Sequence, residues 1–260
     1  MKFVDAHIHL SDEEYAGVVD EVLAEAKNSG LVALVSNSMD LKTCQGTLEL
    51  TKRHPGIVYA AFGIHPLTVE DLQDDELDKV SQLISAQRGN EALVALGEIG
   101  LDSKYMDMWD KQVKVFDLML RLAEKLSLPA IIHSRGTTVQ VIDMLPSYKL
   151  KKVLLHWFSN PISAIGKSVE RGYYITEGPP TIYSNVIREV VKNVPLTNLL
   201  TETDGPVRFF KKPFEGKRTT PSFIPAVIAA FAEIKKISVE EVAEQILENF
   251  QNFFNVTRVL

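Results

Sequence analysis

The sequence predicts an α/β protein with the architecture of a (β/α)₈ TIM barrel, slightly distorted and with an extra C-terminal helix. Short apolar, β-branched runs occur eight times with stretches of helical periodicity between them, which is typical of a barrel of parallel strands. Each run is nearly continuous in apolar residues, as expected of strands that are buried on both faces. A chain of 260 residues, 45% of them hydrophobic, has the length and the apolar content for one such barrel.

The eight strands are expected in the order in which the apolar runs follow one another. Their residues are Phe3–His9, Leu31–Ser36, Val58–Gly63, Leu93–Leu101, Ala130–His133, Lys152–His156, Tyr173–Thr176 and Leu199–Thr203. Connections between parallel strands of one sheet are right-handed crossovers. Because no linker, low-complexity tract or internal repeat interrupts the pattern, we expect one domain over residues 1–260.

The stretches between the strands carry their apolar residues on one face, as amphipathic helices do. The clearest is Lys111–Leu126, and a second apolar stripe lies within residues 18–26. A final helix should begin after Ser238, since Glu241 three residues later completes the pattern of a capping box. This helix is expected to run toward Phe254 and to pack against the barrel.

Composition and charge restrict the compartment and the class of partner. A net charge of −6 argues against a protein that coats nucleic acid with a basic surface, although it allows an enzyme whose bound cations supply local positive charge. The single cysteine, Cys44, excludes an intrachain disulfide and suits a reducing compartment. The sequence shows neither a signal-peptide core nor a run of ~20 apolar residues. We therefore expect a cytoplasmic protein with no membrane partner.

A histidine pair ends the first strand. Residues i and i+2 of a strand point to the same side, so His7 and His9 can present both imidazoles to the mouth of the barrel. Such a pair chelates a divalent metal well, but two histidines at a strand end also occur by chance.

Other metal-binding residue types end four of the later strands. They are Glu98 in the fourth strand, His133 in the fifth, His156 in the sixth and Asp204 after the eighth. The C-terminal ends of the strands hold the active site in barrels of this type. Four histidines and two carboxylates aligned in this way are hard to explain by packing, so the pattern predicts a metal site.

Six ligands are more than one tetrahedral zinc ion uses, so we expect two divalent ions that share a carboxylate. Nitrogen and oxygen ligands without a thiolate suit zinc, magnesium or manganese. Two metals roughly 3.5–4 Å apart favour in-line displacement at phosphorus. The same arrangement hydrolyses amides and esters, so the ligands predict hydrolysis without defining the substrate.

At these motifs the sequence resembles the TatD family of metal-dependent deoxyribonucleases, within the amidohydrolase-type barrels. The resemblance covers nearly the whole chain, and its specificity comes from the order and spacing of the motifs. They are DAHIHL at 5–10, FGIHP at 62–66, LGEIGLD at 96–102, LPAIIHSR at 128–135, LLHWFSN at 154–160, ETDGP at 202–206, GKRTTP at 216–221 and EEVAEQILENFQNFF at 240–254.

The resemblance implies two metal ions that share Glu98. It assigns His7, His9 and Asp204 to one ion and His133 and His156 to the other. It also implies that Asp204 orients or deprotonates the attacking water, so that Asp204 and Glu98 are the catalytic residues. The expected activity is hydrolysis of DNA phosphodiester bonds, from the 3′ end of a single strand, by a monomer.

Substrate contacts are expected from residues around this site. His65 matches a family histidine near the substrate phosphate, although a histidine in a Pro-stiffened loop is the plainer interpretation. Arg135 can present two donors to a phosphate or form a salt bridge at the rim of the barrel. The basic residues after the eighth strand could contact the backbone of a polynucleotide or simply be solvated: Lys211, Lys212, Lys217 and Arg218.

The sequence departs from the family pattern at a few positions that concern the substrate. Gly205 stands where serine is common, Trp157 where a smaller residue is frequent, and Asn160 where glycine is common. Trp157, Phe209 and Phe210 could offer a surface on which bases stack, or could pack under loops.

Two other functions stay open at this point. The same metal site could hydrolyse an amide or an ester, including an aminoacyl ester on RNA. Alternatively, the barrel could keep its metals for stability and bind nucleic acid or another protein without catalysis, which retention of all six ligands disfavours.

Overall fold

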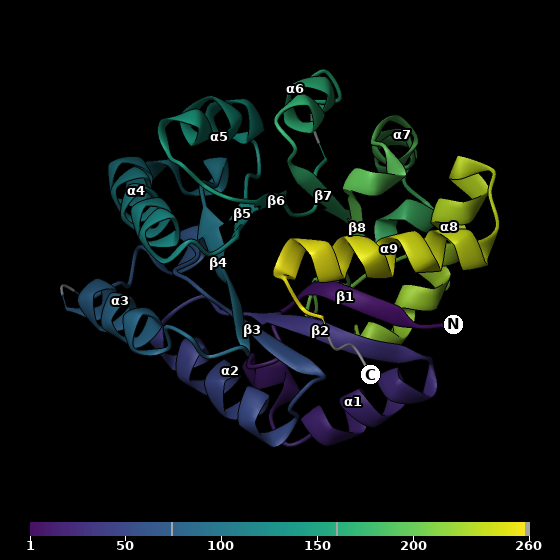
Figure 1. The fold of residues 1–260 in the computed structure, drawn as a ribbon, viewed down its shortest axis with the longest axis horizontal. Helices are drawn as coiled ribbons and strands as arrows, with labels where there is room; N and C mark the ends of the chain where they lie inside the picture. The colour runs from purple at the N-terminus through teal and green to yellow at the C-terminus, as the bar shows by residue number, and fades with distance from the viewer. Residues whose placement is uncertain (74, 160, 258–260) are drawn as a thin grey trace.

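The computed structural model describes residues 1–73, 75–159 and 161–257, and Figure 1 shows their arrangement. Eight parallel strands form one sheet in the order β1 to β8, so neighbours in the sequence are neighbours in the sheet. The predicted α/β barrel is therefore confirmed. The strands are β1 (Phe3–Ile8), β2 (Leu31–Asn37), β3 (Val58–Phe62), β4 (Leu93–Gly100), β5 (Ala130–His133), β6 (Val153–Leu155), β7 (Tyr174–Glu177) and β8 (Leu199–Thr201).

The helices lie around the outside of the strands (Figure 1). They are α1 (Val19–Asn28), α2 (Leu41–Arg53), α3 (Glu76–Ala86), α4 (Trp109–Leu126), α5 (Thr138–Met144), α6 (Ala164–Glu170), α7 (Asn185–Asn193), α8 (Ile224–Lys235) and α9 (Val239–Phe254). Short 3₁₀ helices are η1 (Glu13–Tyr15), η2 (Pro66–Thr68), η3 (Ser103–Met108), η4 (Leu145–Ser147), η5 (Pro179–Ile182), η6 (Leu196–Asn198) and η7 (Pro221–Phe223). In the described part of the chain, no helix combines the length and the apolar character needed to cross a membrane.

The barrel is distorted where its first and last strands meet. Within the described residues no regular ladder pairs β8 with β1, and single hydrogen bonds join them instead. The side chain of Thr201 donates to the carbonyl of Val4 at 2.8 Å, and the amide of Asp204 donates to the carbonyl of His7 at 2.9 Å. Register shifts also interrupt the pairing of β1 with β2, of β3 with β4 and of β4 with β5.

The extra C-terminal helix, α9, is also confirmed. Its N-cap Ser238 accepts a hydrogen bond from the amide of Glu241 at 3.1 Å, which is one of the two bonds of the predicted capping box. The return bond from the Glu241 side chain is absent from the described residues. The helix packs against β1 and β8 and buries Phe250, Phe253 and Phe254. It thereby covers the side of the barrel where the ladder is interrupted.

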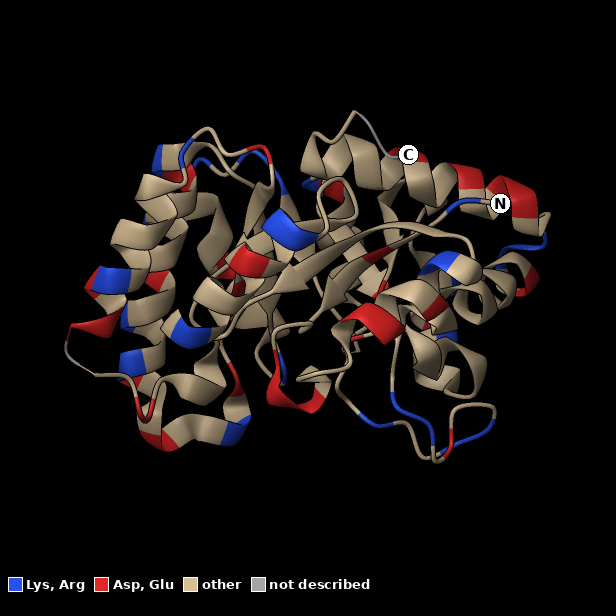
Figure 2. Cartoon of the chain, turned by 90° about the horizontal axis from the view of Figure 1, so that it is seen from below, with Lys and Arg blue, Asp and Glu red and all other residues tan. Residues whose placement is uncertain are grey.

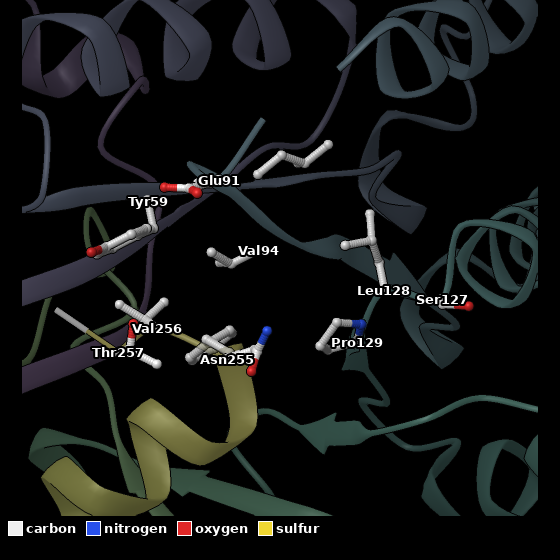
Figure 3. A pocket seen from close by; sticks show the side chains of 11 residues that line it. Tyr59, Glu91, Val94, Ser127, Leu128, Pro129, Asn255, Val256 and Thr257 are labelled. Atoms are coloured by element: carbon white, nitrogen blue, oxygen red, sulfur yellow. The ribbon is translucent and has the colours of Figure 1, made fainter. Parts of the chain in front are cut away.

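A cavity of about 680 Å³ lies where the chain leaves α9 (Figure 3). Its walls include Tyr59 and Val94, at the beginnings of β3 and β4, together with Leu128, Asn255 and Val256. These residues mark the N-terminal ends of the strands, the end that serves stability in barrels of this type. None of the predicted metal ligands lines this cavity.

Most strands end earlier than the sequence predicts. β1 ends at Ile8, β6 at Leu155 and β8 at Thr201, so His9, His156 and Asp204 lie just beyond their strands. Residues whose side chains turn into the mouth of the barrel leave the regular ladder, and apolar patterning does not reveal that change. The side chains of the ligands still reach a common site.

Candidate metal centre

The six predicted ligands converge at the C-terminal ends of the strands. They come from five different elements: His7 in β1 and His9 after it, Glu98 in β4, His133 at the end of β5, His156 after β6 and Asp204 after β8. All are buried except His133, which is partly exposed. Strands distant in the sequence therefore supply one compact polar cluster inside an apolar barrel.

Glu98 lies at the centre of this cluster. Its Oε2 atom is 3.2 Å from Nε2 of His7 and 3.1 Å from Nε2 of His9. Its Oε1 atom is 2.8 Å from both Nδ1 of His133 and Nε2 of His156. The two carboxylate oxygens thus face two different pairs of histidines.

The close approach of β4 and β5 makes this position possible. Gly100 has a φ of +153°, and a Cβ atom at this residue would lie 2.0 Å from the carbonyl oxygen of His133. That same carbonyl accepts a hydrogen bond from the amide of Leu101 at 3.1 Å. A larger residue at position 100 would separate the strands that bring Glu98 and His133 together.

Asp204 completes the half of the cluster formed by the first strand. Its Oδ1 atom is 3.4 Å from Nε2 of His7 and 3.6 Å from Nε2 of His9. The backbone of Asp204 has a φ of +50°, a left-handed conformation that is uncommon outside glycine and that clusters at functional sites. The amide of His9 donates to the carbonyl of Gly205 at 2.7 Å, which fixes this turn against β1.

The protonation of the cluster reflects competition between burial and charge. Burial favours the neutral acid of Glu98, but the surrounding histidines hold its pKa well below the usual value. Burial likewise opposes protonation of His9, yet the neighbouring carboxylates of Asp204 and Glu98 raise its pKa to about 10. Burial lowers the pKa of His7. Buried carboxylates in this cluster therefore need positive charge nearby, which a divalent cation can supply.

The donor atoms fit a metal ion. Three sets of side chains bring their ligand atoms within 4.8 Å of one another: His7, His9 and Asp204; His7, Glu98 and His156; and His65, Glu98 and His133. Oε2 of Glu98 is buried and has no hydrogen-bond partner among the described residues, as expected of an atom that binds a metal. Imidazole and carboxylate donors without a thiolate match zinc, manganese or magnesium.

His65 lies beside this cluster but presents a protonated nitrogen to it. Its Nδ1 atom accepts a hydrogen bond from the amide of Leu67 at 2.9 Å, which assigns the proton of the neutral ring to Nε2. Burial lowers the pKa of His65 to about 4, so the ring is neutral near pH 7. Nε2 is 3.3 Å from Oε1 of Glu98. A neutral ring with this tautomer donates a hydrogen bond and does not bind a metal through Nε2.

Asp102 is a site residue whose role is not predicted by the sequence. Its Oδ2 atom is 2.9 Å from Nε2 of His133, which leaves Nδ1 of that ring facing Glu98. Hydrogen bonds from His133 and Arg135 hold the pKa of Asp102 well below its usual value, although burial opposes this shift. The available signal was its place in the LGEIGLD motif, four residues after Glu98.

Arg135 is held by the same aspartate. Its Nε atom donates to Oδ1 of Asp102 at 3.1 Å, and its Nη2 atom lies 2.8 Å from Oδ2. The side chain of Arg135 is about half exposed, at 53%, and lines the pocket that leads to the site. The salt bridge that is one of the two alternatives for Arg135 is therefore present, and Nη1 has no partner among the described residues.

Glu202 contacts His156 on the side away from Glu98, as Asp102 contacts His133. Its Oε2 atom is 3.4 Å from Nδ1 of His156 and accepts a hydrogen bond from the hydroxyl of Thr176. Both Glu202 and His156 are almost completely buried. Carboxylates that contact the far nitrogen of a ligating histidine fix its orientation and increase its basicity. Glu202 lies in the ETDGP motif, but the motif gave no indication of this contact.

A pocket of about 600 Å³ connects the cluster to the surface. Its polar floor is made by the predicted ligands other than His7, and its walls include Leu67, Tyr105, Trp157 and Val207. Phe209 is 4% exposed and packs against Trp157, so of the two alternatives for Phe209 the structure shows packing under a loop. Phe210, its neighbour, is 83% exposed.

Three residues differ from those common in the family, and the structure describes the surroundings of two of them, Gly205 and Trp157. Gly205 leaves room for Tyr15, because a Cβ atom at position 205 would lie 2.0 Å from the hydroxyl oxygen of Tyr15. Trp157 is partly buried at the wall of the pocket. Asn160 lies outside the described residues.

Comparisons with known proteins agree with this geometry. The sequence model of the family "TatD related DNase" matches residues 4–255. The chain is 32% identical to the uncharacterized metal-dependent hydrolase YabD of Bacillus subtilis, over 97% of this chain and 98% of YabD. It is 32% identical to the deoxyribonuclease TATDN3 of Homo sapiens, over 99% of this chain and 96% of that protein. The crystal structure of YjjV, a TatD homolog from Escherichia coli, superposes with a TM-score of 0.90 at 29% identity, over 98% of both chains.

Proposed function

Since this chain belongs to the TatD related DNase family of metal-dependent hydrolases, we propose that it cleaves phosphodiester bonds of DNA with two divalent metal ions. We further propose that it acts as a monomer on single-stranded DNA and removes nucleotides from the 3′ end. The name of the human relative supports DNA as the substrate.

The position of Glu98 carries the proposal of two ions. One oxygen faces His7 and His9, and the other faces His133 and His156, so Glu98 would help to hold both ions. His7, His9 and Asp204 would hold the first ion together with Glu98. His133 and His156 would hold the second, with Asp102 and Glu202 orienting these two rings.

When bound, the ions would lower the pKa of a water molecule and offset negative charge on the phosphoryl oxygens. Asp204 would accept the proton of the attacking water, because its histidine neighbours hold a deprotonated carboxylate at the floor of the pocket. Burial opposes this ionisation, but His9 and the other histidines lower the pKa of Asp204. The new bond forms between the water oxygen and phosphorus, and the bond to the 3′ oxygen breaks as that oxygen gains a proton.

Two side chains would hold the phosphate for this reaction. His65 donates from Nε2, and the tautomer fixed by the amide of Leu67 makes this donor available near neutral pH. Arg135 keeps Nη1 for the substrate while Asp102 holds its other two nitrogens. A neutral donor and a cation together orient the phosphate without adding negative charge to the site.

The test measures cleavage of labelled single-stranded DNA by the metal-loaded protein. Glu98→Ala should abolish turnover and reduce the bound metal, while its circular dichroism spectrum stays unchanged. Glu244→Ala, at an exposed glutamate of α9, is the matched control and should keep both. Parental rates in metal-loaded Glu98→Ala would contradict the mechanism. Oligonucleotides labelled at the 3′ or the 5′ end determine the direction of cleavage.

A panel of substrates separates the other functions. It includes single-stranded DNA, RNA, a simple phosphodiester, an aminoacyl ester and small amides. Cleavage of amides or of the aminoacyl ester alone would replace the nuclease proposal. Tight binding of nucleic acid without hydrolysis of any substrate would favour the non-catalytic barrel.

A further inference from the structure

The loop of residues 207–218, which follows Asp204 and β8, differs in charge from the rest of the molecule. It contains five basic residues and one acidic residue, Glu215, in a protein whose net charge is −6. In Figure 2 this loop, with its blue segments, extends away from the body of the protein. Its first residue, Val207, lines the pocket of the metal centre, so the loop begins at the site itself.

A small aromatic core fixes the conformation of this loop. Phe209, Phe214 and Phe223 are buried together, with ring centroids 6.1 Å apart for the first pair and 4.5 Å for the second. The ring of Phe209 also lies 6.1 Å from that of Trp157, at the wall of the pocket. With Phe209 anchored inward, Phe210 is directed to solvent and is 83% exposed. A large aromatic side chain held in water on a fixed loop is available for a ligand.

Four of the five basic residues of the loop fall into two groups. Lys211 and Lys212 follow Phe210 directly, and both are exposed; Nζ of Lys211 lies 5.3 Å from the centre of the ring of Tyr183. Lys217 and Arg218 instead share a surface groove with Glu21 and Glu25.

Nearby carboxylates reduce the attraction of the second group for a polyanion. Arg208 is also occupied, since its guanidinium group pairs with Glu14. The cations best placed for a phosphate chain are therefore Lys211 and Lys212.

We propose that Phe210, Lys211 and Lys212 form a binding strip for single-stranded DNA next to the scissile nucleotide. Phe210 stacks on a base, and the two lysines contact the adjoining phosphates. A nucleotide offers one aromatic face and one anion, which matches an exposed phenylalanine beside lysines. The inference rests on the proposed nuclease function and specifies how that site holds the rest of its substrate.

The test compares a substrate that reaches the strip with one that does not. Phe210→Ala should raise KM for a labelled single-stranded oligonucleotide by about 5- to 150-fold, the range for loss of one stacked base. Its kcat and KM for bis(p-nitrophenyl) phosphate should be unchanged, because this small diester occupies only the metal centre. Phe210→Trp should restore the parental KM for the oligonucleotide.

The lysines provide a matched pair of variants. Lys212→Ala should weaken DNA binding and reduce the slope of log affinity against log salt by about 0.7, the value for one phosphate contact on a single strand. Lys217→Ala removes the same charge from the same loop and should change neither quantity, because Lys217 lies beside Glu21 and Glu25. Equal effects of the two variants would contradict the strip.

Equilibrium binding of fluorescent single-stranded DNA separates this inference from the proposed function. If the wild type cleaves neither substrate, the proposed function fails, while weaker binding by Phe210→Ala would still support the strip. Unchanged binding and KM in Phe210→Ala would overturn the strip even if DNA is cleaved. Loss of binding to anionic phospholipid vesicles, with DNA binding unchanged, would assign Phe210 to a membrane surface instead.

Discussion

Replacing Gly205 by alanine should destabilise the protein through its contact with Tyr15. The added Cβ atom would lie 2.0 Å from the hydroxyl oxygen of Tyr15, a residue that is completely buried. That hydroxyl donates to the carbonyl of Thr219 at 2.7 Å, so it cannot move without losing a buried hydrogen bond. The backbone of Gly205 does not have a left-handed φ, so the clash is the main effect of the substitution.

The expected cost follows from these two contributions. Overpacking of a filled interior costs about 1–3 kcal/mol. Loss of the Tyr15 hydrogen bond, with a buried carbonyl left unpaired, costs about 1–3 kcal/mol more. Alanine also restricts the unfolded chain more than glycine does, which stabilises the folded state by about 0.4–1 kcal/mol. We therefore expect Gly205→Ala to lower the free energy of unfolding by about 1–5.6 kcal/mol.

A double-mutant cycle with Tyr15→Phe tests this cause. The other nearest atoms to the added Cβ are 3.3 Å away, so removing the hydroxyl relieves the severe overlap. The double variant should be about as stable as Tyr15→Phe alone, measured by urea unfolding at constant m-value. Additive losses in the double variant, or a stable Gly205→Ala protein, would refute the reasoning.

Three further predictions concern the metal centre and the core. Asp102→Asn should weaken metal binding by about 10- to 100-fold, since His133 loses the carboxylate that orients it. Titration with zinc measures the affinity, and an unchanged affinity would show that Asp102 does not orient His133 for the metal. Removal of metal by a chelator should lower the melting temperature, because an ion at 100 times its Kd stabilises the fold by about 2.7 kcal/mol. Equal melting curves with and without metal would show that the stability of the fold does not depend on bound metal. Burial raises the pKa of the Cys44 thiol to about 12 from 9.0, so the thiol should react with a disulfide reagent at pH 8 only as fast as the protein opens. Because its pKa is raised, the buried Cys44 thiol contributes its full stability to the fold below pH 9, and this contribution falls as the pH rises toward 12. Rapid labelling of the native protein at pH 8 would contradict the burial on which both predictions depend.

The sequence was sufficient to predict the barrel and the convergence of its ligands. Continuous apolar runs identify strands buried on both faces, and a polar residue at the end of such a run must lie at the mouth of the barrel. His7, Glu98 and His133 could therefore be assigned to one site without coordinates. The geometry adds that the two oxygens of Glu98 face different histidines.

The contacts behind the ligands could not be predicted in this way. Asp102 reaches His133 because the chain turns into η3 directly after β4, and no periodicity predicts the direction of that turn. The same limit applies to Phe209 and Phe210, which are adjacent and identical in type. Phe209 is the buried one of the pair because it packs against Trp157. This contact joins residues that are distant in the sequence, so the local sequence does not reveal it.

The central claim is that metal ions held around Glu98 drive phosphodiester hydrolysis. The most direct measurement determines the metal content of the purified protein together with its rate on labelled single-stranded DNA, before and after removal of metal by a chelator. We predict two ions per chain in the active protein, loss of cleavage on their removal, and recovery when a divalent metal is returned. Cleavage at the parental rate by metal-free protein would contradict the claim.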